Sequence, residues 1–186
     1  MKHPSSRAFY AYWDSQRGDE RAPCRSVIEP GALRELLGDI FMVSYNPSEG
    51  HLVRVAGTRV NALLGGETKG VRFADLFVKQ SRADLAEIIR AVGDDMLVAV
   101  AGVSGQKADG TLAHLELLLM PLRARAHAPR AITGLLVPLF PGRLAALSRL
   151  DLMSWRYVTR SSQSAQSRTL RTLALARGLV VYEGLR

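Results

Sequence analysis

The sequence has little of several residue types that define common protein classes. Its 186 residues include a single cysteine, Cys24, which excludes an internal disulfide framework and is typical of a reducing compartment. The four histidines are dispersed and lack the paired spacing of a metal site, so we expect no bound metal. There is no apolar run long enough to cross a bilayer and no signal-peptide pattern, which indicates a cytoplasmic location.

Residues arranged for catalysis are also scarce. The glycines at positions 57, 65, 66 and 70 match neither phosphate-loop pattern, and we interpret them as positions that require a positive φ. His114 and Glu116 share one face of a predicted strand and could form an acid/base pair, although a polar face that is exposed or covered by a helix is the commoner arrangement. We therefore expect the protein not to be an enzyme.

Charge is present but unevenly distributed. Of the formal net charge of +8, residues 143–186 carry eight arginines against Asp151 and Glu183, which is 8 − 2 = +6. A solvated basic tail is the commoner explanation of such a segment. The alternative is an arginine-rich module that binds nucleic acid or another anionic surface, such as a membrane.

The first predicted element is a helix from Ser5 or Ser6 to Arg17. Its apolar face is narrow and aromatic, because Phe9, Tyr12 and Trp13 recur at helical spacing. Such a helix either lies across a sheet of its own molecule or pairs with the same helix of a second molecule. We predict a homodimer in which these three residues take part.

The rest of the pattern alternates between strands and short helices. The expected elements, in order, are a short helix at 30–37, strands at 40–45 and 52–56, a short helix around 60–64, a helical turn at 73–77, a longer helix at 81–93 with a capping box of Ser81 and Asp84, and strands at 96–104, 112–122 and 132–139. Hairpin turns join the strands within each group, which predicts an α+β fold with a five-stranded antiparallel sheet and short helices on one face.

Three regions follow from this pattern. Residues 1–25 form an N-terminal helix and connector, 26–142 the core, and 143–186 a basic extension. Within the extension, Leu144, Leu147 and Leu150 suggest one helix face, and Leu170, Leu173 and Ala174 suggest another. Residues 161–169 are polar and low in complexity, so we expect the extension to be helical or partly flexible.

Several motifs, taken in order, resemble a known family over about residues 8–140. They are Tyr12-Trp13-Asp14-Ser15-Gln16-Arg17-Gly18, Ile28-Glu29-Pro30, Ile40-Phe41-Met42, Val55-Ala56-Gly57-Thr58-Arg59, Gly70-Val71-Arg72-Phe73 and Asp75-Leu76-Phe77. Together they resemble a PAS domain of a bacterial PAS-like family whose members are usually short stand-alone proteins. The resemblance implies a cytoplasmic signalling or regulatory role, exerted through a small ligand or a protein partner. It implies no reaction and no catalytic residues.

The PAS resemblance also allows cofactors to be considered. The helix at 81–93 contains no histidine to bind haem, and Cys24 lies in the N-terminal connector, away from the position of a flavin-reactive cysteine. Both cofactors are disfavoured, and the identity of any cofactor stays open. An apolar or amphipathic ligand is the remaining candidate. Its predicted contacts are Phe73, Leu76, Phe77, Leu115 and Leu117, with Arg59 and Asn61 as polar anchors. Alternatively, the apolar side chains only fill the core.

Overall fold

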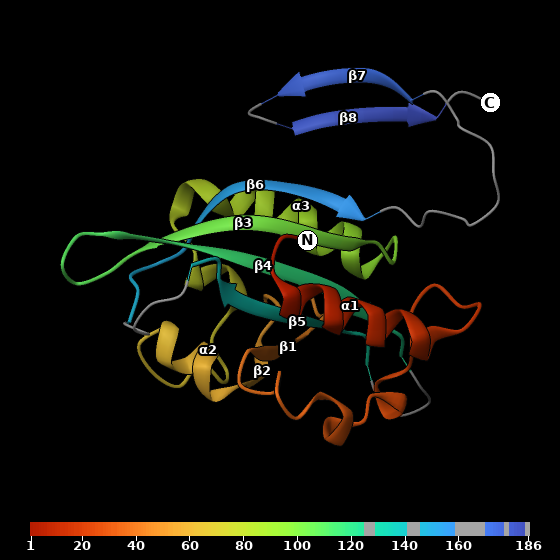
Figure 1. Cartoon of the computed structure of the whole chain (residues 1–186), viewed down its shortest axis with the longest axis horizontal. Helices are drawn as coiled ribbons and strands as arrows, with labels where there is room; N and C mark the ends of the chain where they lie inside the picture. The colour runs from red at the N-terminus through yellow and green to blue at the C-terminus, as the bar shows by residue number, and fades with distance from the viewer. Residues whose placement is uncertain (125–128, 141–145, 159–169, 177–178, 185–186) are drawn as a thin grey trace.

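The computed structural model describes residues 1–124, 129–140, 146–158, 170–176 and 179–184. Its main feature is a six-stranded antiparallel sheet with the strand order β2-β1-β5-β4-β3-β6, and a two-stranded sheet pairs β7 with β8 (Figure 1). The strands are β1 Ile40–Ser44, β2 Val53–Ala56, β3 Val98–Gln106, β4 Leu112–Leu122, β5 Ala131–Pro138, β6 Asp151–Val158, β7 Leu170–Ala176 and β8 Leu179–Gly184.

The helices are mostly short. They are α1 Pro4–Arg17, α2 Thr58–Leu63 and α3 Arg82–Gly93, together with the 3-10 helices η1 Arg25–Val27, η2 Pro30–Leu33, η3 Phe73–Leu76 and η4 Lys79–Ser81. Of these, α1, η1 and η2 precede β1, and α2, η3, η4 and α3 lie between β2 and β3. None of the helices in the described ranges is both long and apolar enough to cross a membrane. The predicted helix at 30–37 is wrong beyond Leu33, where the chain forms turns instead.

Both faces of the large sheet are covered, and the alternation of β4 explains why. Leu115, Leu117 and Leu119 pack into the cluster formed with α3 and the short helices, whereas Leu118 and Met120 pack into a second cluster beneath α1. Figure 1 shows α1 and α3 on opposite sides of the sheet. The predicted α+β PAS-like fold is therefore confirmed.

Helix α1 lies across its own sheet. Phe9 and Trp13 are buried, with 1% and 2% of their surface exposed, and the Trp13 indole N–H donates a hydrogen bond to the Pro121 carbonyl at 3.0 Å. Tyr12 is half-buried, and its hydroxyl accepts a hydrogen bond from the Glu29 N–H at 2.9 Å. Phe9 and Trp13 are therefore not available to a second molecule, and the homodimer stays a prediction.

The segment after the predicted core departs most from expectation. The sheet has six strands instead of five because Asp151–Val158 forms β6 and pairs with β3. The helices expected through Leu147 and Leu150 and through Leu170 are both wrong, since Leu147 and Leu150 form isolated β-bridges with Lys107 and Phe77, and Leu170 begins β7. The helical spacing of these leucines does not outweigh their pairing with other strands and loops. Leu144 and residues 161–169 lie outside the described residues.

Candidate functional site

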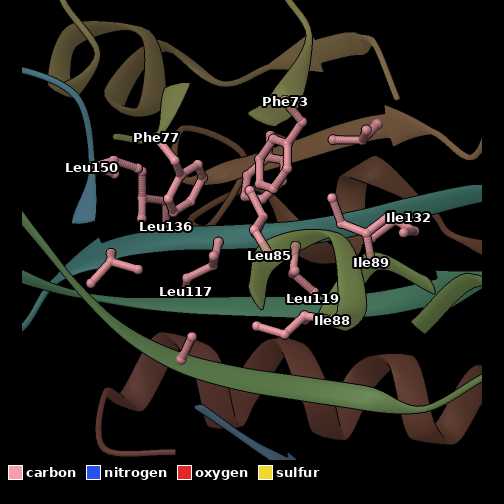
Figure 2. Packing of buried hydrophobic residues seen from close by; sticks show 14 of the residues in the cluster. Phe73, Phe77, Leu85, Ile88, Ile89, Leu117, Leu119, Ile132, Leu136 and Leu150 are labelled. Atoms are coloured by element: carbon pink, nitrogen blue, oxygen red, sulfur yellow. The ribbon is translucent and has the colours of Figure 1, made fainter. Parts of the chain in front are cut away.

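The candidate site is the interior between the sheet and the short helices, where the sequence predicts a cavity. Helix η3 is a single turn, so Phe73 points from its start and Phe77 follows its end (Figure 2). The rings of Phe41 and Phe73 stack with centroids 5.4 Å apart, and the rings of Phe73 and Phe77 meet edge to face at 5.6 Å. Three aromatic rings therefore fill the middle of this interior.

The space left between these side chains is very small. The cavity measures about 10 Å³ and is lined by Phe41, Val53, Val60, Leu64, Thr68, Phe73, Leu76, Leu117, Leu136 and Leu150. A single water molecule needs roughly 10–15 Å³, so this volume is at the lower limit even for one water. The interior is a packed core in this conformation.

The predicted apolar contacts are brought together, but not all of them reach the cavity. Phe73, Leu76 and Leu117 line it. Phe77 and Leu115 belong to the same core cluster without lining the cavity, and neither has any exposed surface. The observed packing agrees with the alternative interpretation, in which these side chains fill the core.

The two predicted polar anchors do not line the cavity. The Arg59 guanidinium donates to both carboxylate oxygens of Asp39 at 2.7 Å, and this pairing raises the pKa of Arg59 above its usual value. Asn61 accepts hydrogen bonds from the Thr68 N–H at 3.2 Å and the Thr68 hydroxyl at 2.9 Å. Both side chains thus connect α2 to neighbouring loops through hydrogen bonds. Their contact with a ligand stays a prediction.

A segment that the sequence placed outside the core closes this interior. Residues 146–150, which we call the strap, run between β5 and β6. The Leu147 N–H donates to the Leu63 carbonyl at 2.8 Å, and the Leu150 N–H donates to the Leu76 carbonyl at 2.8 Å. Leu150 is 2% exposed and lines the cavity. The strap therefore joins α2 and η3 to the sheet.

The start of α3 is fastened to β6 next to the strap. The Ser81 hydroxyl donates to the Asp151 carboxylate at 2.6 Å and accepts from the Leu152 N–H at 2.9 Å. The predicted capping box is wrong, because the Ser81 side chain makes no capping bond within its own helix. Apolar residues at 147 and 150 were the only signal of the strap in the sequence, and their spacing of three suggested a helix.

Of the predicted polar pair His114 and Glu116 on β4, it is Glu116 whose side chain makes structural contacts. The Glu116 carboxylate accepts hydrogen bonds from the backbone N–H of Lys2 at 2.5 Å and of His3 at 3.1 Å. Burial alone would raise the pKa of Glu116, but these hydrogen bonds outweigh it and lower the pKa below the usual value. His114 is exposed. Glu116 thus holds the start of α1 on the sheet.

The remaining candidates for cofactor or metal chemistry are the cysteine and the possible metal ligands. Cys24 precedes η1, and its backbone forms an isolated β-bridge with Arg123. It is not among the residues that line the cavity. Within the part of the chain that the structure describes, no three histidine, cysteine, aspartate or glutamate side chains are placed to hold a metal ion.

Comparison with known proteins identifies one family over most of the chain. A family described as PAS domain matches residues 1–137. Among solved structures, the LOV protein of Rhodobacter sphaeroides is similar at 17% identity and a TM-score of 0.45, over 57% of this chain and 64% of that one. An RNA-binding light-oxygen-voltage receptor is similar at 18% identity and a TM-score of 0.44, over 63% of this chain and 35% of that one. The chain thus spans less than two thirds of either structure. No curated protein sequence matches it.

Proposed function

Because this chain belongs to the PAS domain family, we propose that it is a regulatory protein of signal transduction that acts through its surface, by binding protein partners. The observation that carries the proposal is the packed interior, with a cavity of about 10 Å³. Pockets that bind small molecules are usually about 300–1,000 Å³. A ligand, or a cofactor the size of haem or flavin, would have to displace side chains such as Phe73, Leu76 and Leu117.

A non-enzymatic role is supported by the hydrogen bonds that the candidate polar side chains make within the fold. Glu116, the acid of the only pair that the sequence suggested for catalysis, is occupied by backbone N–H groups. Arg59 is occupied by Asp39, and Asn61 by Thr68. Each of these side chains already has a partner within the fold, so none is a free group directed at a substrate.

The proposal predicts that the protein is isolated without a bound small molecule. Native mass spectrometry of the full chain should give the mass of the polypeptide or of its multiples alone. Sedimentation velocity of the same sample should show a dimer if the partner is a second copy. A non-covalent small molecule present in stoichiometric amount would contradict the proposal, because the interior would then be a ligand site.

A second candidate rests on the charge of +6 carried by residues 143–186. Binding to nucleic acid or another anionic surface would weaken steeply as salt is raised. The test is an electrophoretic mobility assay on the full chain and on a variant with Arg160, Arg168 and Arg177 changed to glutamine. Loss of binding in the variant supports this candidate, and binding that is absent or insensitive to salt excludes it. Removing everything after Gly142 would be a poor test, since it also removes β6.

A further inference from the structure

A groove of about 680 Å³ opens on the surface where three segments from distant parts of the sequence meet. They are the end of α1 with the loop that follows it, the loop between α3 and β3, and the end of β6, all on the same side of the molecule in Figure 1. The volume is within the range of about 300–1,000 Å³ typical of binding pockets. Among the side chains that the structure describes, none has to move for this space to be open, unlike in the interior.

The floor of the groove is apolar. Trp13 and Val98 are buried beneath it, with 2% and 5% of their surface exposed, and Met96 and Val158 are half-buried beside them. Tyr157, at 37% exposed, stands on the rim. The floor can therefore take up an apolar side chain and remove its surface from water.

The walls carry an excess of negative charge. The charged residues that line the groove are Asp14, Asp19, Glu20 and Asp95 against Arg17 and Arg21, which is 2 − 4 = −2. The protein as a whole carries +8. The groove is therefore an acidic site on a basic molecule.

Ion pairs engage two of the four carboxylates. Glu20 pairs with Arg123, which is not among the lining residues, at 3.1 Å. Arg17 pairs with Asp14 at 2.5 Å and lies over the Trp13 ring at 5.8 Å, so its charge is already engaged. Asp19 and Asp95 are exposed and stand on different segments, one after α1 and one before β3. Neither forms an ion pair with another residue in the described ranges.

We propose that this groove binds a segment of a partner protein that carries arginine or lysine around an apolar anchor residue. The cationic side chains would meet Asp19 and Asp95, and the anchor would pack against Met96 and Leu97, which keep exposed apolar surface in the groove. An acidic segment is excluded by repulsion, and an uncharged one would leave the carboxylates without partners. The inference rests on the proposed function, because it names the chemistry of the partner that the regulatory surface would bind.

The test uses fluorescence anisotropy on the full chain with a labelled peptide in which arginines flank a tryptophan and a leucine. The variant D19N/D95N removes the unpaired carboxylates, and E35Q/E67Q removes the same charge from exposed positions outside the groove. We expect D19N/D95N to weaken binding about five- to tenfold and E35Q/E67Q to leave it within about twofold. Tyr157→Ser should weaken binding about threefold through the lost apolar contact.

Several outcomes would overturn the proposal. They are absence of binding at low salt, equal weakening by both double variants, and equal binding of a peptide with glutamate in place of arginine. If changing Arg160 and Arg168 to glutamine raises peptide affinity severalfold, the chain's own tail is the occupant. If D19N/D95N dissociates a dimer in sedimentation, the occupant is a second copy. Both results contradict an external partner.

The peptide titration can fail independently of the native mass spectrometry that tests the proposed function. A small molecule found by native mass spectrometry would overturn the packed-interior account and leave the peptide titration interpretable. If the protein is isolated without a ligand but D19N/D95N does not change peptide binding, only the groove proposal is wrong. Binding that falls with D19N/D95N and not with E35Q/E67Q is the expected result.

Discussion

Gly57 begins α2 with a φ of −66°, so the positive φ expected of it is wrong. Its requirement is space. A Cβ atom on Gly57 would lie 2.1 Å from the Leu37 carbonyl oxygen and 2.3 Å from the Gly38 carbonyl oxygen, both of them backbone atoms. For Gly65, Gly66 and Gly70 the expectation is correct, with φ values of +80°, +158° and +83°. The sequence shows that glycine is needed here, but the cause at Gly57 lies in a segment twenty residues away.

Replacing Gly57 with alanine should therefore destabilise the fold. The added methyl group must push apart the backbone around Leu37 and α2, at a cost of about 1–3 kcal/mol. The matched control is Gly31→Ala in η2, where a Cβ would meet no atom within 4 Å and the change should stay within about 0.5 kcal/mol. Urea unfolding followed by tryptophan fluorescence measures both, and equal free energies of unfolding for the two variants would show that the close approach is absent.

The predicted polar anchors illustrate the same limit at single residues. Arg59 and Asn61 are polar residues in a mostly apolar stretch, which made them natural candidates for contact with a ligand. Their partners, Asp39 and Thr68, lie twenty and seven residues away in the sequence. A pairing of this kind leaves no periodic signal, so only the folded structure assigns it.

Among the elements, those with a clear period were predicted well. β4 runs over Leu112–Leu122, the predicted range, and its apolar side chains pack alternately into the clusters on the two faces of the sheet. α3 runs over Arg82–Gly93, one residue from the predicted start, because its apolar residues recur at helical spacing. The strap has a misleading spacing, because Leu147 and Leu150 lie three residues apart as in a helix although the segment is not helical. Its role comes from hydrogen bonds to the Leu63 and Leu76 carbonyls.

A stability measurement can decide whether the strap belongs to the core or to a tail that contributes little to folding. Leu150→Ala should lower the free energy of unfolding by about 2–5 kcal/mol, because it enlarges the cavity next to Phe73 and Leu76. Met153→Ala on β6 is the control, since Met153 is 55% exposed and its loss should cost no more than about 0.5 kcal/mol. Thermal or urea unfolding decides the point. A Leu150→Ala variant as stable as Met153→Ala would mean that residues 146–150 do not close the core.

For the whole molecule, the sheet has both faces covered and its sixth strand is supplied from beyond the predicted core boundary at residue 142. The fold class followed from the order of elements, since hairpin turns restrict how neighbouring strands can pair. The groove could not be predicted in this way. Its walls come from the end of α1, the loop before β3 and the end of β6, and no sequence pattern links them.

The central claim is that the interior of this PAS domain is filled by its own side chains. The most direct measurement is a crystal structure of the full chain under xenon pressure, with Phe73→Ala as the matched variant. A dry apolar cavity of sufficient size binds xenon. With about 10 Å³ available, we predict no ordered xenon among Phe73, Leu76 and Leu117 in the wild-type protein, and ordered xenon there in the variant. Ordered xenon at this position in the wild-type protein would contradict the account.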